Sequence, residues 1–107
     1  MIYELRIYTI CEGRMPNIHA RFADHAIALF EKHGMHIIDF FEDINESKIY
    51  YIVEHESMQS HDDNFKAFFA DPEWIRVREE SEADGPIVAK VETHFLARTP
   101  YSPNKAK

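Results

Sequence analysis

His25 is the side chain best suited by type and position to do chemistry in this sequence. It lies within residues 17–33, where apolar residues recur every three or four positions, and a regular helix places it between Phe22 and Leu29. An imidazole in such a place serves as a general base or orients a ligand in a pocket. The alternative is a buried histidine that is hydrogen-bonded to a backbone carbonyl or to a side chain of the sheet. His25 is thus the candidate catalytic residue.

Glu4, Arg6 and Tyr8 occupy every second position of the N-terminal segment. In a strand this spacing puts all three side chains on one face, where their polar ends reach one another or a neighbouring strand. One interpretation is a site for an anionic or phenolic ligand. The other, which we favour because buried charges need partners, is a salt-bridged layer that lines the interior of a dimer. The partners expected for that layer on the last strand are Lys90, Glu92 or His94.

Aromatic residues make up 13% of the chain, which is enough to line a cavity for an apolar or aromatic molecule. The same residues also suffice as the core of a small domain, and we expect most of them to serve there. A few are left to face a pocket between the helices and the sheet. The candidate ligand-binding residues are Tyr3, Phe22, His25, Phe65 and Trp74.

Seven histidines raise the question of a metal site. Their spacings do not favour one, since His19 and His25 are well separated around a helix and no close histidine pair has a clear helical context. His61, followed by Asp62 and Asp63, is interpreted as the solvated start of a helix. The three glycines form neither a phosphate-binding loop nor a nucleophile elbow. We therefore predict no metal and no cofactor.

Composition narrows the range of partners. A formal net charge of -7 over 107 residues disfavours nucleic acid, and no apolar run approaches the ~20 residues that span a bilayer. The single cysteine, Cys11, forms no disulfide within the chain, which suggests a reducing compartment. We expect a cytoplasmic protein.

The periodic segments predict the elements that hold these residues. Residues 2–10 alternate apolar and polar side chains as a half-buried strand does, and Gly34 suits the end of the first helix. Ser57 and Asp71 are suited to cap two consecutive helices, the second of which starts at Pro72 and is anchored by Trp74 and Val77. The pattern predicts strands over residues 2–10, 35–42, 48–54 and 87–96, a helix over 17–33, and an extended tail over 98–107.

The predicted order is βαβ followed by βαβ, and it indicates one α+β domain over residues 1–107 with a ferredoxin-like fold. Two helices would pack on one face of a four-stranded antiparallel sheet. The other face would carry apolar groups such as Ile38, Tyr50 and Ile52. Covering that face with a second copy of the chain is the simplest solution, so we expect a homodimer.

Several segments of the chain resemble bacterial members of the NIPSNAP family, within the dimeric α/β barrel superfamily. They are Met1-Ile2-Tyr3-Glu4-Leu5-Arg6 with Tyr8-Thr9, Arg21-Phe22 to His25-Ala26, Phe30 to His33-Gly34, Ala70-Asp71-Pro72-Glu73-Trp74 and Arg98-Thr99-Pro100-Tyr101-Ser102-Pro103. The resemblance implies a ferredoxin-like domain that dimerises through its sheets into an α/β barrel. It implies little chemistry, because relatives in the superfamily include cofactor-free monooxygenases and haem-dependent enzymes.

Three functions remain open from the sequence. The first is the binding or processing of a small apolar or aromatic molecule in a pocket between helices and sheet. The second is a cofactor-free or haem-dependent monooxygenase-like activity, and the third is a structural or interaction module that acts through dimerisation. We rank the small-molecule role first and leave open whether the protein is an enzyme.

Overall fold

Four strands and two helical stretches follow the predicted order in the computed structural model, which describes residues 1–104. The strands are β1 (Ile2–Ile10), β2 (His36–Glu42), β3 (Lys48–His55) and β4 (Val88–Leu96). The first helical stretch consists of α1 (Met15–Arg21), the π-helical turn η1 (Phe22–Ala26) and α2 (Ile27–Lys32). The second consists of α3 (Met58–Ala70) and α4 (Pro72–Ser81).

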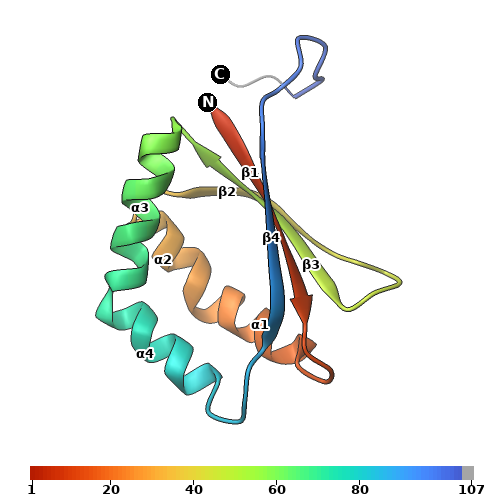
Figure 1. Cartoon of the computed structure of the whole chain (residues 1–107), viewed down its shortest axis with the longest axis vertical. Coiled ribbons are helices and arrows are strands. Elements are labelled where there is room, and N and C mark those ends of the chain that lie inside the picture. The colour runs from red at the N-terminus through yellow and green to blue at the C-terminus, as the bar shows by residue number, and fades with distance from the viewer. Residues whose placement is uncertain (105–107) are drawn as a thin grey trace.

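All strands belong to one antiparallel sheet in the order β2-β3-β1-β4, so β1 and β3 are central. Both helical stretches lie on the same side of this sheet (Figure 1). The chain therefore has the ferredoxin-like arrangement that the sequence predicts. Every polar side chain on the helix side of β1 must find its partners inside this layer.

Tyr51 of β3 lies at the centre of the core and is completely buried. Its ring contacts the rings of Tyr8, Phe22, Phe30 and Phe40 at centroid distances of 5.3, 5.1, 6.1 and 5.0 Å. These rings come from two strands, β1 and β2, and from η1 and α2 of the first helical stretch. The Tyr51 side chain therefore joins the sheet to that helical stretch. Burial of an aromatic side chain of this size stabilises the fold by roughly 1.5–3 kcal/mol.

The π-helical turn η1 explains why His25 does not point inward as predicted. The amide of Ile27 donates to the carbonyl of Phe22, five residues back, so the turn holds one residue more than an α-helical turn. The extra residue shifts the phase of the helix. Ala26 then takes the inward position, and His25 is exposed.

Strand β2 carries an irregularity that sorts its apolar residues between the two faces. Its register with β3 shifts between Ile37 and Asp39. Ile37 and Phe40 both pack against the core, although strict alternation would put residues three positions apart on opposite faces. Ile38 and Phe41 remain on the face that the helices leave uncovered, with 39% and 56% of their surface exposed.

The predicted helix ends are confirmed by their hydrogen bonds. The hydroxyl of Ser57 accepts from the amide of Ser60 at the start of α3. Asp71 caps α4 through the amide of Glu73, and its other carboxylate oxygen accepts from Lys32 and His33 at the end of the first helical stretch. Asp71 therefore joins the two helical stretches as well as starting α4.

Gly34 ends the first helical stretch with a positive φ of 76°. The amide of Gly34 donates to the carbonyl of Glu31 and that of Met35 donates to Phe30, which is the Schellman pattern of a helix C-terminus. The chain then turns directly into β2.

The helix-free face of the sheet is apolar and partly covered by the segment that follows β4. A cavity of about 470 Å³ on this face is lined by apolar side chains that include Ile38, Phe41, Ile52 and Leu96. Ile38 and Ile52 were predicted to lie on this face. Arg98 donates to the hydroxyl of Tyr3 at 2.9 Å. Residues 98–104 continue beyond the sheet as an irregular tail (Figure 1), and residues 105–107 of the predicted tail lie outside the described residues.

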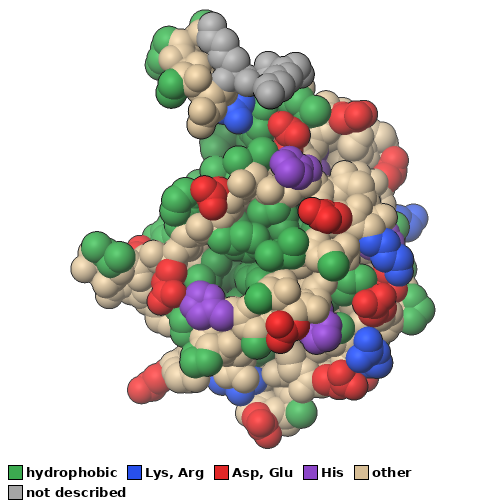
Figure 2. Space-filling view, turned by 180° about the vertical axis from the view of Figure 1, so that it is seen from behind, with side chains coloured by type: hydrophobic (Ala, Val, Ile, Leu, Met, Phe, Trp, Pro, Cys, Tyr) green, Lys and Arg blue, Asp and Glu red, His purple; other side chains and the backbone are tan. Residues whose placement is uncertain are grey.

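A second apolar surface lies at the β2 edge of the sheet, between β2 and the first helical stretch. Seen from behind, hydrophobic side chains gather in a hollow on the side where β2 is the nearest strand (Figure 2). A groove of about 310 Å³ there is lined by Phe22, Ile27, Phe40 and Ile49 among others. Within residues 1–104, none of the helices has the length and apolar character needed to cross a membrane.

Candidate functional site

The polar face of β1 turns toward the helices, not toward the open face. Glu4 is buried to 1% exposure, and Arg6 and Tyr8 follow it on the same face. The predicted partners on the last strand are therefore wrong. Lys90 forms its ion pair with Glu92 of its own strand instead. The partners of the β1 side chains come from β3 and α3, and they are Tyr51, His55 and His61.

Arg6 is the centre of this polar network. Its Nε donates to the hydroxyl of Tyr51 at 2.7 Å, and its Nη1 donates to Oε2 of Glu4 at 2.8 Å. Its Nη2 donates more weakly to the hydroxyl of Tyr8 at 3.4 Å. The guanidinium also lies 4.8 Å from the centroid of the Phe65 ring, a cation–π contact with α3. The guanidinium is thus held from both layers of the domain.

The network keeps Arg6 charged and Tyr51 neutral. Burial alone would lower the pKa of Arg6, but Tyr51, Tyr8 and Glu4 outweigh burial and raise that pKa above its ordinary value. Burial raises the pKa of Tyr51 well above its ordinary value. Burial would also raise the pKa of Glu4, but the hydrogen bond from His55 and the charge of Arg6 lower it below its ordinary value. The site therefore holds a fixed cation, a neutral phenol and a carboxylate.

One end of this network reaches a cleft between α4 and β4. The cleft has a volume of about 420 Å³. Its cationic side chains are Arg6, Arg21 and Arg78. Its apolar side chains include Phe69, Trp74, Val88 and Val91. Glu82 offsets part of the positive charge, since it accepts from Arg21 at 3.0 Å and from Arg78 at 3.3 Å.

The cleft has the character of a ligand pocket. Phe69 and Val91 are about half exposed, with 52% and 48% of their surface open to solvent. Charged donors beside apolar walls are the usual lining of a small-molecule site. A neighbouring depression of about 560 Å³ shares four lining residues with the cleft, namely Phe69, Trp74, Arg78 and Glu82. Only residues of α3, α4 and the residue after α4 line this depression, and Arg6 is not among them.

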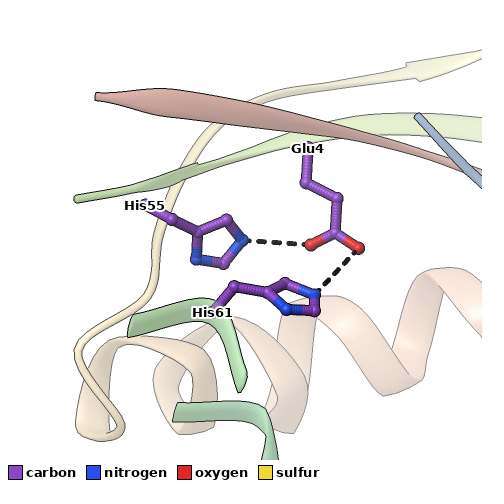
Figure 3. Close-up of side chains that lie close together, drawn as sticks. All are labelled: Glu4, His55 and His61. Carbon is purple, nitrogen blue, oxygen red and sulfur yellow. Dashed lines mark hydrogen bonds and ion pairs between the residues drawn. The ribbon is translucent and has the colours of Figure 1, made fainter. Parts of the chain in front are cut away.

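The other end of the network is a cluster of two histidines and a carboxylate. Nε2 of His55 lies 3.0 Å from Oε1 of Glu4, and Nε2 of His61 lies 3.5 Å from Oε2 of Glu4. Figure 3 shows both imidazole rings directed at the two carboxylate oxygens. The His55 side chain is fully buried, and the His61 side chain is 18% exposed.

The structure does not bring the five predicted site residues to one place. Trp74 lines the cleft, whereas Phe22 and Phe65 are buried in the core. Tyr3 lies across the sheet, under Arg98. His25 lies in a shallow surface depression between α1 and α4, so its predicted catalytic role has no geometric support.

Tyr51, His55 and His61 were not assigned to the network from the sequence. Their spacing along β3 and α3 could have indicated it. Tyr51 and His55 are four positions apart on β3, with the buried Val53 between them, so they share the buried face of that strand. His61 precedes Phe65 by four positions on α3, which places it on the buried stripe of that helix. The interpretation of this segment as the solvated start of a helix therefore holds for Asp62 and Asp63, which are exposed, but not for His61, whose side chain is only 18% exposed.

Solved structures with the same fold include NIPSNAP proteins from two bacteria. A NIPSNAP family protein from Agrobacterium tumefaciens strain C58 has a TM-score of 0.85 at 20% identity, over 97% of this chain and 98% of that one. A NIPSNAP domain protein from Burkholderia xenovorans has a TM-score of 0.82 at 15% identity, over 97% and 100%. A putative antibiotic biosynthesis monooxygenase from Nitrosomonas europaea reaches 0.63 at 7% identity, over 92% and 98%.

A comparison with curated proteins finds no match. The low identities of the solved structures establish the fold alone. The sequence model of the NIPSNAP family is more specific, because it matches residues 3–103, which include β1 with its polar face, both helical stretches and most of the tail. On this match across nearly the whole length, the chain belongs to the NIPSNAP family.

Proposed function

We propose that the protein binds a small apolar or aromatic molecule with an anionic group, in the cleft between α4 and β4. The observation that carries the proposal is Arg6, a charged guanidinium fixed by Tyr51 and Glu4 at a cleft with apolar walls. A buried, oriented guanidinium pairs well with a carboxylate, sulfonate or phenolate. This keeps the role predicted from the sequence and moves the pocket away from His25.

The two kinds of cleft residue would have different tasks. Trp74 and Phe69 would contact the apolar body of the ligand, and their aromatic faces favour a flat ring. Arg78 would attract the anionic group from the rim, because its side chain is 61% exposed. The cleft is cationic although the whole chain carries a formal net charge of -7, so the sign of the local charge selects anions.

The monooxygenase alternative has a weaker basis. It rests on likeness of fold to proteins named as monooxygenases at 7% and 14% identity, with TM-scores of 0.63 and 0.62. A shared fold of this kind supports no particular reaction. We therefore propose binding and leave a reaction out of the proposal.

The test uses Trp74, the only tryptophan of the chain, as the reporter. The probe is 8-anilinonaphthalene-1-sulfonate, and N-phenyl-1-naphthylamine, which has the same aromatic frame without the sulfonate, is its neutral counterpart. Energy transfer from Trp74 reports that the probe is bound to the protein, and the arginine variants described next assign its position. We expect saturable binding of the sulfonate, tighter than that of the neutral amine.

Matched arginine variants locate the anion. Arg76 and Arg78 are both exposed on α4, but only Arg78 lines the cleft. Arg78→Met should weaken sulfonate binding about 2- to 5-fold, as expected for an exposed charge, and Arg76→Met should leave it unchanged. Arg6→Met should weaken it about tenfold or more without affecting the neutral amine. Equal effects of Arg76→Met and Arg78→Met would reject the cleft as the anion site.

We also propose that two copies of the chain pair through the helix-free face of the sheet. Ile38, Phe41 and Leu96 on that face are 39%, 56% and 44% exposed, which is unusual for a cluster of large apolar side chains. A second copy would bury the same face of its partner by a two-fold axis, as a closed dimer requires. The cleft opens on the other side of the sheet, so pairing would leave it accessible.

A further inference from the structure

Glu4, His55 and His61 form a group whose two imidazoles have no task in the binding cleft. They come from β1, from the end of β3 and from the first turns of α3. Each residue offers one atom that could bind a metal, and these three atoms lie within 4.8 Å of one another. Two imidazoles and one carboxylate are the donor set of many catalytic zinc and non-haem iron sites.

The hydrogen bond to Asp62 sets the chemistry of His61. Nδ1 of His61 lies 2.8 Å from Oδ1 of Asp62, and a carboxylate only accepts, so Nδ1 carries the proton. In the neutral ring Nε2 then has a lone pair directed at Oε2 of Glu4, 3.5 Å away. A proton on Nε2 or a bound metal ion would satisfy this contact, and the geometry leaves room for either.

The same contact is a known accessory of metal ligands. A histidine that binds a metal through one nitrogen commonly donates its other N–H to a carboxylate, which fixes the ring and raises its basicity. Asp62 provides this contact from the surface, since its own side chain is 65% exposed.

The present spacing is close to what a metal needs. Zinc bound tetrahedrally at ~2.0–2.1 Å separates its ligand atoms by roughly 3.4 Å. Nε2 of His55 lies 3.0 Å from Oε1 of Glu4, and Nε2 of His61 lies 3.5 Å from Oε2, the other carboxylate oxygen. One ligand atom from each residue lies within 4.8 Å of the other two, so the three side chains must move closer together to hold one ion. The two rings are nearly perpendicular, with centroids 5.0 Å apart, so their donor nitrogens approach the carboxylate from different directions (Figure 3).

We propose that Glu4, His55 and His61 bind one divalent transition-metal ion of the zinc class, with Asp62 as the outer contact of His61. Imidazole donors favour zinc, iron, nickel and copper over magnesium and calcium. Three protein ligands leave a fourth position of a tetrahedral ion for water or another small ligand. This site lies at the other end of the Arg6 network from the proposed binding cleft and shares Glu4 with that network, because Glu4 accepts from Arg6.

Two features of the site set limits on affinity. Arg6 already donates to Oε2 of Glu4, so the ion must share the carboxylate with a guanidinium. Nδ1 of His55 is buried and has no hydrogen-bond partner among residues 1–104, so His55 lacks the outer contact that His61 has. Binding should therefore be weaker than at a structural zinc site with a complete outer shell. The exposed edge of His61 provides the entry path.

The experiment is titration calorimetry of the full-length protein, free of any histidine tag, with Zn²⁺ alone. Co²⁺ is the second probe, because its visible absorption reports the number and geometry of its ligands. His61→Ala removes a ligand. Asp62→Asn leaves every ligand in place and removes only the charge of the outer contact, so it separates a metal site from a merely structural role. His25→Ala is the matched control, since His25 is an exposed helical histidine away from the cluster.

We expect one Zn²⁺ per chain in the wild type and in His25→Ala. Affinity should fall about 10- to 100-fold in Asp62→Asn and further in His61→Ala. Co²⁺ should give the strong bands of a four- or five-coordinate ion, lost in His61→Ala. Unchanged Zn²⁺ binding in His61→Ala would overturn the proposal in favour of adventitious surface binding. Absence of binding to the wild type would also overturn it and leave a protonated His61 as the cation beside Glu4.

Discussion

Nε of Arg6 lies 2.7 Å from the hydroxyl oxygen of Tyr51, and the two residues are directly opposite each other on β1 and β3. The cation at the cleft is therefore anchored by the central pair of strands and not by a mobile loop. Because Tyr51 is completely buried, its hydroxyl has no competing access to water. A preorganised cation of this kind binds an anion without first losing side-chain freedom.

Tyr51→Phe should destabilise the protein and weaken anion binding together. The change leaves Nε of Arg6 largely buried without its acceptor and removes the partner of the Tyr8 hydroxyl, 2.8 Å away. We expect a loss of about 1–3 kcal/mol in the free energy of unfolding, measured by urea denaturation. Tyr50→Phe, on the open face of the same strand, is the matched control and should have a smaller effect. Equal losses would argue against the importance of the buried network.

His25→Ala should have almost no effect on stability. The side chain is exposed because of the π-helical turn, and exposed substitutions of this kind change the free energy of unfolding by about 0.5 kcal/mol or less. Phe22→Ala in the same turn should cost about 3–5 kcal/mol, since Phe22 is 8% exposed and contacts the rings of Tyr8, Phe40 and Tyr51. Urea denaturation of both variants tests whether Phe22 faces the core and His25 faces solvent. A large loss in His25→Ala would mean that the ring points inward.

The pairing of Asp71 should make stability depend on pH in the acid range. Hydrogen bonds from Lys32, from His33 and from the amide of Glu73 lower the pKa of Asp71 below its ordinary value of 3.8. A carboxylate with a lowered folded-state pKa stabilises the fold above pH 3.8 and loses this contribution as the pH falls through its folded-state pKa. Asp71→Asn keeps a good capping side chain and removes the charge.

The urea midpoint of the wild type should therefore exceed that of Asp71→Asn at pH 7, and the two should approach each other at low pH. Asp84→Asn, at an exposed position after α4, is the control and should follow the wild type at every pH. A gap between wild type and Asp71→Asn that stays constant from pH 7 to pH 2 would show that the charge of Asp71 contributes nothing.

Ile52→Glu should separate the proposed dimer. Ile52 lies on the open face of β3, where a buried carboxylate would lack a partner in a sheet-to-sheet interface. Sedimentation velocity should give twice the 12.6 kDa chain mass for the wild type and the single-chain mass for the variant. Ile75→Glu places the same change on α4, where Ile75 is 43% exposed, and should sediment like the wild type. A wild-type protein of single-chain mass would reject the dimer.

The elements were predictable because their local signals agree with one another. Alternation identifies β1, and Ser57, Asp71 and Gly34 cap helix ends in the structure as their types suggest. Local rules of this kind are additive along the chain, so a single sequence suffices to place them.

The candidate site was predictable only in part, for two physical reasons. Periodicity assumes a constant helical turn, and a single extra residue in η1 is enough to move His25 from the inside to the outside. One face of β1 carries Tyr3, Leu5 and Ile7 and the other carries Glu4, Arg6 and Tyr8, and alternation alone does not decide which face meets the helices. That choice depends on Tyr51 and His55 of another strand, which provide the partners that Arg6 and Glu4 need.

The shifted register of β2 has a consequence for how the protein behaves in concentrated solution. β2 is an edge strand, and an unpaired edge is a template on which unfolded chains can add further strands and start aggregates. The irregularity between Ile37 and Asp39 interrupts the regular row of backbone donors and acceptors, and the exposed carboxylate of Asp39 adds a charge at that point. The same local defect that sorts the apolar side chains of β2 thus also protects its free edge against the growth of intermolecular sheets.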